Sequence, residues 1–222
     1  MSTAESYIIQ AQLEQEKQEP VMNKIHNVDC LEFMKTIPDD YFDLVLTDPP
    51  YGIGDKFKGG KNSKMSNFNE IVDKGWDNAP SKQVFNEIIR ISKNQIIWGG
   101  NYFDLPPTRG FIIWDKKISE DFTLAMAEYA WTSFDALAKI YRLSTEKGNR
   151  LHPTQKPQKV IEYCLNYSDV EKHHKVFDPF MGSGTTALAC KSLGLDWCGC
   201  ELESDYVEIA NKRLEQVQGS LF

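Results

Sequence analysis

The chain has 222 residues, 41% of them hydrophobic and 26% charged, which suits one globular domain with a full core. A formal net charge of −7 argues against a protein that coats nucleic acid non-specifically, but it permits a local basic surface. The chain has no long apolar span, its start lacks the features of a signal peptide, and its five cysteines are scattered through apolar stretches. We therefore expect a cytoplasmic protein that has reduced thiols and binds no membrane.

We expect residues 1–22 to form a polar peripheral segment and residues 23–222 to form one domain. Short runs rich in β-branched and aromatic residues predict strands. In chain order these runs are NKIHNV, FDLVLT, QIIWGG, GFIIWD, EYAWTSF, ALAKIYRL, KVFD and LDWCGCEL. Capped or amphipathic segments predict helices at DCLEFMKTI, KQVFNEIIRIS, QKVIEYCLNY, TTALACKSLG and ESDYVEIANKRLEQV. Strands and helices alternate at both ends of the chain, which predicts an α/β fold with a mostly parallel sheet.

Residues at the starts of three helices support these boundaries. Asp29 and Ser81 are N-cap residue types, whose side-chain oxygens can accept hydrogen bonds from free backbone N–H groups. Pro157 suits a first turn because the N–H that it lacks would have no partner there. Residues 52–80 are rich in glycine and lysine and lack periodicity, which is typical of a functional or disordered loop.

A glycine-rich turn joins strand to helix in VFDPFMGSGTT, residues 176–186. Gly182 and Gly184 let the backbone approach a ligand whose polar groups face the free N–H groups of the helix start. Glu201 ends the next predicted strand, where an acid typically accepts hydrogen bonds from ribose hydroxyls. The pattern indicates a nucleotide-type site.

Three classes of ligand compete for this site. A P-loop is disfavoured because no lysine follows Gly184. A dinucleotide fingerprint has Ala187 in place of its third glycine, although that position tolerates alanine. The Asp178 carboxylate would repel a diphosphate but suits the cationic sulfonium and ammonium groups of S-adenosylmethionine. We therefore favour a nucleoside cofactor that lacks a pyrophosphate.

The sequence contains three motifs in this order: DPPY at 48–51, HPTQKP at 152–157 and DPFMGSGTT at 178–186. Together they resemble the DNA amino-methyltransferases of the circularly permuted β class, including phage or bacterial orphan enzymes. The resemblance covers roughly residues 24–215. It implies a Rossmann-like S-adenosylmethionine-dependent methyltransferase fold, with a seven-stranded sheet that contains one antiparallel strand. It also implies transfer of a methyl group to the exocyclic N6 of adenine in double-stranded DNA.

The resemblance also assigns roles to residues at matching positions. The catalytic motif comprises Asp48, Pro49, Pro50 and Tyr51. The cofactor-binding positions are Asp29, Cys30, Thr154, Gln155, Lys156, Asp178, Pro179, Phe180, Gly182, Ser183, Gly184, Thr185 and Glu201. No metal is implied, and the sequence offers no metal-binding constellation.

Basic residues on two loops are candidates for contact with DNA phosphates, and solvated loops are the alternative. These residues are Lys56, Lys58, Lys61, Lys64, Arg142, Lys147 and Arg150. About ten residues separate Tyr141 from His152, which is too few for a separate target-recognition domain. We therefore expect a short or relaxed target site, or discrimination by the 52–80 loop or by a second subunit of a homodimer. The motifs leave the recognised sequence and any restriction partner open.

The DPPY motif has a direct chemical rationale. The amino group of adenine is a poor nucleophile because its lone pair is delocalised into the ring. If the Asp48 carboxylate and the Pro49 carbonyl accept its hydrogen bonds, the nitrogen is held closer to tetrahedral and can attack the sulfonium methyl. Tyr51 can stack on the base once it is flipped out of the duplex, which offsets part of the lost stacking.

Other functions compete with this hypothesis. Cytosine-N4 enzymes of the family usually carry Ser at the first position of the motif, so Asp48 favours adenine without settling the choice. A catalytically silent S-adenosylmethionine-binding partner subunit is disfavoured by the intact motifs. A dinucleotide-dependent oxidoreductase is the least favoured alternative.

Overall fold

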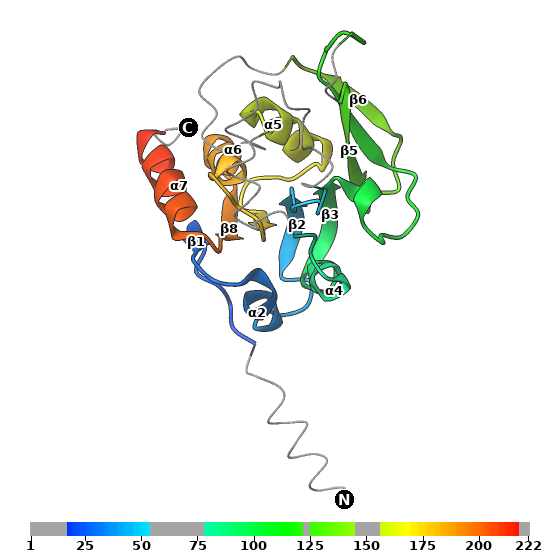
Figure 1. The fold of residues 1–222 in the computed structure, drawn as a ribbon. Helices are drawn as coiled ribbons and strands as arrows, with labels where there is room; N and C mark the ends of the chain where they lie inside the picture. The colour runs from blue at the N-terminus through cyan, green and yellow to red at the C-terminus, as the bar shows by residue number, and fades with distance from the viewer. Residues whose placement is uncertain (1–16, 54–77, 122–124, 145–155, 218–222) are drawn as a thin grey trace, which may run out of the picture.

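The computed structural model describes residues 17–53, 78–121, 125–144 and 156–217, and the fold below is that of these ranges. Their strands are β1 (Lys24–His26), β2 (Phe42–Thr47), β3 (Ser92–Trp98), β4 (Phe111–Asp115), β5 (Ala127–Thr132), β6 (Lys139–Arg142), β7 (Lys175–Asp178) and β8 (Asp196–Cys200). They form one eight-stranded sheet in the order β1-β8-β7-β2-β3-β5-β4-β6 (Figure 1). Strand β5 runs antiparallel to both its neighbours, β3 and β4, and the other pairings are parallel.

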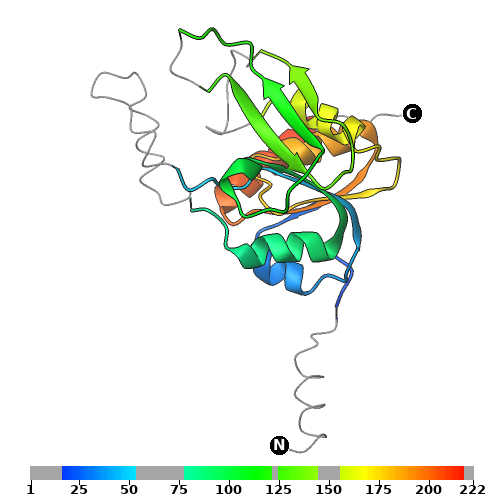
Figure 2. The same cartoon turned by 90° about the vertical axis from the view of Figure 1, so that its right-hand side faces the viewer.

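The sheet has helices on both faces. The described helices are α2 (Cys30–Lys35), α4 (Lys82–Ile91), α5 (Gln158–Tyr167), α6 (Thr185–Leu193) and α7 (Ser204–Gln216), with a short 3-10 turn η2 (Gly100–Tyr102). Figures 1 and 2 show α2 and α4 on one face of the sheet and α5, α6 and α7 on the other. None of these helices has the length and apolar character that a membrane span requires.

Two hydrophobic clusters fill the layers on either side of the sheet. Successive residues of a strand point to opposite faces, so Leu44 and Leu46 join the cluster under α5 and α6 while Val45 joins the one under α2 and α4. Ile96 and Ile97 divide between the clusters in the same way. Because both faces are covered, these strands are apolar throughout rather than alternating, as parallel strands usually are.

The predicted α/β fold and its single antiparallel strand are confirmed. The residue runs predict eight strands, and the described part of the sheet has eight, so the seven implied by the family resemblance is one too few. Asp29 caps α2 as predicted, because its Oδ1 accepts hydrogen bonds from the N–H groups of Leu31 and Glu32 at 2.9 and 3.0 Å. Ser81 occupies the N-cap position of α4 but makes no capping hydrogen bond with its side chain. Pro157 immediately precedes α5, as predicted.

Candidate active site

Three neighbouring strands end at one edge of the sheet and bring the predicted acids there. Asp48 directly follows β2, Asp178 is the last residue of β7, and Glu201 directly follows β8. These strands are parallel neighbours in the order β8-β7-β2, so their carboxyl ends lie together. Ligands of open α/β sheets bind at this edge.

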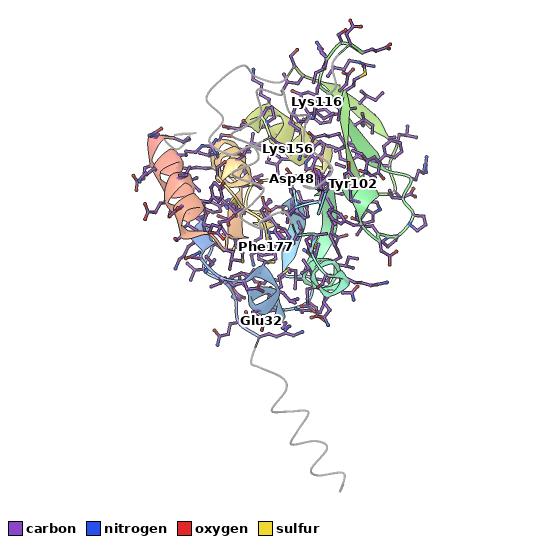
Figure 3. All side chains as sticks on the ribbon, in the orientation of Figure 1. Glu32, Asp48, Tyr102, Lys116, Lys156 and Phe177 are labelled. Atoms are coloured by element: carbon purple, nitrogen blue, oxygen red, sulfur yellow. The ribbon has the colours of Figure 1, made fainter. Side chains whose placement is uncertain are left out.

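The Asp48 carboxylate is held from two sides. The Tyr51 hydroxyl donates a hydrogen bond of 2.7 Å to its Oδ1, and Lys156 Nζ lies 2.5 Å from its Oδ2. Lys156 comes from the segment before α5, and only 5% of its side-chain surface is exposed. Its ammonium also lies 4.8 Å from the centre of the ring of Trp98, which is fully buried. Figure 3 labels Asp48 and Lys156, which lie close together near the centre of the molecule.

A second carboxylate, Glu128 in the antiparallel strand β5, extends this network. Its Oε2 lies 3.1 Å from Lys156 Nζ, and its Oε1 lies 2.5 Å from Nζ of Lys116, the residue after β4. Two ammonium groups and two carboxylates therefore alternate in the order Lys116, Glu128, Lys156, Asp48. The charges cancel in sum, which limits the penalty of removing each from water.

The titration of these groups follows from burial and from their neighbours. Burial raises the pKa of Asp48, Lys156 opposes that rise and Glu128 adds to it. Burial alone would raise the pKa of Glu128, but Lys156 and Lys116 outweigh it and bring the pKa down to about 2. Burial alone would lower the pKa of Lys156, but its acidic neighbours hold that pKa well above the ordinary value. Glu128 and Lys156 are therefore both charged at neutral pH.

An aromatic surface borders Asp48 on its open side. The Tyr51 ring stacks on Tyr102 of η2, with centroids 4.9 Å apart and planes at 21°, and Tyr102 keeps 48% of its surface exposed. Gly99 makes room for this arrangement, because a Cβ at that position would lie 2.2 Å from Cε1 of Tyr51. Its φ of +67° also favours glycine. Such a surface can stack against a planar ring.

The glycine-rich turn after β7 is held by Glu201. The Gly182 N–H donates to Oε2 of Glu201 at 2.8 Å, and the Glu203 N–H donates to Oε1 at 2.9 Å. A Cβ at Gly182 would meet nothing closer than a backbone oxygen at 4.0 Å, so this position opens onto free space. A Cβ at Gly184 would instead lie 2.8 Å from the Cβ of Ala210 in α7. The surroundings of the two glycines therefore differ: Gly182 faces free space, whereas Gly184 lets α7 approach.

The other predicted cofactor-binding residues of the turn are buried or half-buried. Pro179 and Ser183 are buried, Phe180 is half-buried, and Thr185 begins α6. The guanidinium of Arg213, in α7, donates from Nη1 to the backbone carbonyl of Ser183 and, at 3.1 Å, to its Oγ.

Asp178 joins the two motifs. Only 3% of its surface is exposed, and its Oδ1 accepts hydrogen bonds from Thr47 Oγ1 at 2.8 Å and the Phe180 N–H at 3.0 Å. Its Oδ2 accepts one from Thr186 Oγ1 at 2.6 Å. Burial raises its pKa to about 6 despite these bonds. The carboxylate thus has internal partners on both oxygens, and its predicted contact with a cofactor stays a prediction.

The structure places the other predicted residues as follows. Pro49 is buried and Pro50 half-buried beside Asp48. Asp29 and the half-buried Cys30 lie after β1, at the same edge of the sheet, and burial raises the pKa of Cys30 to about 12. Arg142 lies on the outermost strand, β6, where its Nε is 3.3 Å from Oδ2 of Asp115. The other eight candidates lie outside the described residues: Lys56, Lys58, Lys61, Lys64, Lys147, Arg150, Thr154 and Gln155.

Residues that the motifs do not name also shape the site. Glu128 and Lys116 lie in or beside predicted strands, and the only signal for Glu128 was a charge within the apolar run EYAWTSF. Thr47 and Tyr102 likewise belong to no predicted motif. All four residues reach the site only because strands that are distant in sequence are adjacent in the sheet.

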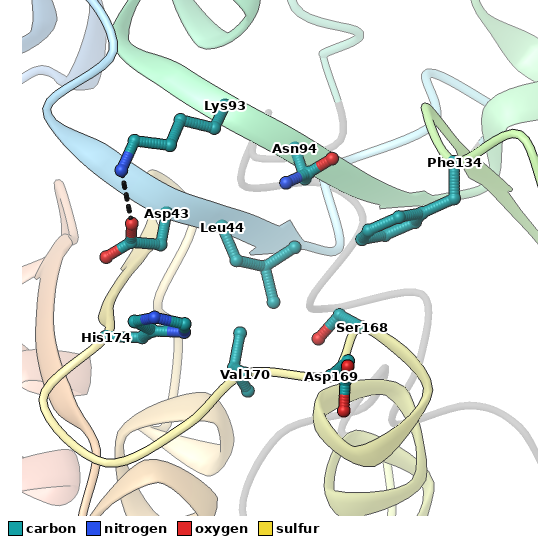
Figure 4. A pocket seen from close by; sticks show the side chains of 9 residues that line it. All are labelled: Asp43, Leu44, Lys93, Asn94, Phe134, Ser168, Asp169, Val170 and His174. Atoms are coloured by element: carbon teal, nitrogen blue, oxygen red, sulfur yellow. Dashed lines mark hydrogen bonds and ion pairs between the residues drawn. The ribbon is translucent and has the colours of Figure 1, made fainter.

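A separate pocket of about 370 Å³ lies at the opposite edge of the sheet, near the amino ends of β2 and β3 (Figure 4). Asp43 and Lys93 pair across it at 2.7 Å, and His174 lines it from the loop before β7. It shares no lining residue with the site around Asp48.

Comparisons with known proteins show what this chain and its fold are similar to. A family model described as DNA methylase matches residues 97–212. The Type II methyltransferase M.HinfI of Haemophilus influenzae is 27% identical over 255 residues, which cover 89% of this chain and 69% of that protein. The solved structure of the M1.HpyAVI-SAM complex has a TM-score of 0.54 and 23% identity, and the match covers 86% of this chain and 98% of that one. The PvuII DNA methyltransferase (cytosine-N4-specific) has a TM-score of 0.60 and 15% identity, with 89% and 87% covered. The two structures share the fold described above.

Proposed function

The chain belongs to the DNA methylase family, whose model matches more than half of its length, and on that premise we propose that it methylates the N6 amino group of adenine in double-stranded DNA. The methyl donor in this proposal is S-adenosylmethionine. Cytosine N4 is the second candidate acceptor, because one solved structure of the same fold is a cytosine-N4-specific enzyme. Asp48, at the first position of the DPPY motif, favours adenine.

One observation carries the proposal. Thr47, the residue before Asp48, donates a hydrogen bond to Asp178, the residue that opens the glycine-rich turn. A single buried contact therefore joins the predicted catalytic motif to the predicted cofactor motif, although 131 positions separate the two residues. A methyl donor in the turn and an acceptor at Asp48 would lie within the same small region, as direct transfer requires.

The residues of the turn fit S-adenosylmethionine. Gly182 opens onto free space, and Glu201 stands at the end of β8, where it can accept hydrogen bonds from ribose hydroxyls. Asp29 and Cys30 lie at the same sheet edge, after β1, the strand beside β8. When bound, the cofactor supplies an electrophilic methyl group on a cationic sulfur.

Asp48 and Tyr51 would act on the base. An ionised Asp48 accepts a hydrogen bond from the amino group and can take the proton that the nitrogen loses after methylation. In the structure the Tyr51 hydroxyl, 2.7 Å from Oδ1, occupies the place that the amino group would take. The base would therefore displace that hydroxyl and stack on the ring. Pro49 would offer its backbone carbonyl as the second acceptor.

The test is methyl transfer by purified protein from labelled S-adenosylmethionine to DNA, followed by digestion and identification of the nucleoside. We expect N6-methyladenine, and we expect Asp48→Ala to abolish transfer while cofactor affinity is kept. Asp135→Ala, which changes an exposed carboxylate with 86% of its side-chain surface free, is the matched control and should be fully active. A digest that contains only N4-methylcytosine would refute the adenine assignment. Undiminished transfer by Asp48→Ala would refute the role of Asp48, and cofactor binding without any transfer by the wild type would favour a silent subunit.

We also propose a short or relaxed target sequence, because no segment long enough for a recognition domain separates Tyr141 from His152. Mapping of methylated positions in DNA from cells that express the protein tests this. A long and strictly defined motif would contradict it.

A further inference from the structure

We infer that Lys156 and Glu128 are positioning residues that act as a pair on Asp48: Lys156 keeps its carboxylate ionised and in place, and Glu128 offsets part of the charge of the lysine. The inference rests on the proposed function, in which an ionised Asp48 accepts a hydrogen bond from the amino group. It assigns a role to Glu128, which lies in no motif, and to Lys156, which the motif alone places near the cofactor.

The position of Lys156 is determined by its partners. An ammonium group has three N–H donors. Among the described residues, three oxygens surround this one: Asp48 Oδ2 at 2.5 Å, Glu128 Oε2 at 3.1 Å and the Tyr51 hydroxyl at 3.4 Å. With 5% of the lysine side chain exposed, solvent has little room to replace any of them. The ammonium can therefore neither rotate away from Asp48 nor move without leaving oxygens unpaired.

Stability alone gives a weak reason for such an arrangement. Replacing a buried ion pair by apolar side chains of similar volume is often neutral or stabilising, because each charge must lose its water. Here the pair is attached to the carboxylate that the proposed reaction needs in one charge state. A protonated Asp48 would carry an O–H donor in place of one acceptor and would compete poorly for the amino hydrogen.

The two neighbours act on Asp48 in opposite directions. The ammonium of Lys156 favours the ionised carboxylate, whereas the negative charge of Glu128 and burial favour the protonated one. In the part of the chain that the structure describes, the Tyr51 phenol and, behind Glu128, the ammonium of Lys116 also face this network.

Asp178 is a further carboxyl within electrostatic reach of Asp48. It is common to the wild type and to every variant used below, so it does not affect a comparison between them. The comparison can therefore isolate the effects of Lys156 and Glu128.

The experiment uses the full chain and measures kcat/KM for DNA against pH, whose acid limb reports the pKa of the essential base in the free enzyme. Lys156→Met should move the acid limb to higher pH by about one unit or more, which is roughly a tenfold loss of activity just below the wild-type limb. Glu128→Gln, which is isosteric and keeps an oxygen acceptor, should move the limb to lower pH. Lys156→Arg should restore the wild-type limb, and Lys82→Met, which alters an exposed lysine, should leave it unchanged.

A merely structural pair would give a different result. Both substitutions would then lower activity at every pH without moving the limb, or would move it in the same direction, and either outcome overturns the inference. If Lys156→Met does not fold, Glu128→Gln alone still tests the sign of the shift.

A second measurement does not depend on activity. Aspartate labelled at the side-chain carboxyl carbon gives an NMR titration of each carboxyl, and Asp48→Asn identifies the Asp48 signal. Its midpoint should rise in Lys156→Met and fall in Glu128→Gln without DNA or cofactor present. If the two variants shift the midpoint in opposite directions but the wild type methylates nothing, the pair is upheld and the proposed function is refuted. Unchanged midpoints in an active protein would refute the pair alone.

Discussion

Asp178 yields a prediction about stability that tests its internal role. It is 3% exposed, and burial raises its pKa from the ordinary 3.8 to about 6. The folded chain therefore binds this proton more tightly than the unfolded chain does. The contribution to stability is fully present below about pH 3.8 and is lost as the pH rises through about 6. Asp178→Asn removes the titrating group and nearly preserves its shape.

The size of the effect follows from the two pKa values. The full difference corresponds to about 3 kcal/mol, of which about 1.4 kcal/mol falls between pH 5 and pH 7.5. Urea unfolding of both proteins at these two pH values measures it. The wild type should lose about 1.4 kcal/mol more than Asp178→Asn, because the titrations of groups remote from Asp178 cancel in the difference. Parallel pH dependences in the two proteins would refute the internal role, and Asp135→Asn should match the wild type.

Two further predictions concern the aromatic surface and the cofactor turn. Gly99→Ala forces a methyl group to within 2.2 Å of the Tyr51 ring at a φ of +67°. It should therefore reduce methyl transfer at least about tenfold and lower the free energy of unfolding by about 1–2 kcal/mol. The cofactor affinity measured by calorimetry should stay unchanged. Arg213→Ala removes the donor to the Ser183 carbonyl and should weaken S-adenosylmethionine binding about tenfold in the same calorimetric assay. The control is Lys191→Ala, which removes a comparable hydrogen bond from Lys191 Nζ to a backbone carbonyl of α7, outside the turn. If both variants lose the same affinity for S-adenosylmethionine, the hydrogen bond to Ser183 has no special role in the cofactor turn.

Features with a local physical cause could be predicted from the sequence. The cap at Asp29 and the helix start after Pro157 depend on neighbouring backbone groups only, and both are in place. Each of the eight described strands also has its own apolar or β-branched run in the sequence. The edge that carries Asp48 and Glu201 follows from the parallel order of the strands.

Contacts between strands that are distant in sequence could not be predicted in the same way. The pairing of Lys156 with Asp48 and Glu128 requires the segment before α5 to cross the ends of β2 and β5, which no spacing in the sequence encodes. The internal partners of Asp178 are equally hidden, because Thr47 and Thr186 are ordinary residues of a strand and a helix until the fold brings them together. A charge in an otherwise apolar strand run, such as Glu128 in EYAWTSF, is the one local signal of such a contact.

The two oxygens of Asp48 differ in how readily their partners can be exchanged. Displacing Lys156 from Oδ2 would leave oxygens of Asp48, Glu128 and Tyr51 without a donor in a nearly closed site. Displacing the Tyr51 hydroxyl from Oδ1 leaves one acceptor free, and the amino group of a base is the donor that can fill it. In the proposed reaction the base would therefore take the place of the Tyr51 hydroxyl, while the lysine stays in place. Gly99→Ala disturbs Tyr51, whose hydrogen bond lowers the pKa of Asp48 less than the charge of Lys156 does, so Lys156→Met should give the larger change in the pH at which Asp48 titrates.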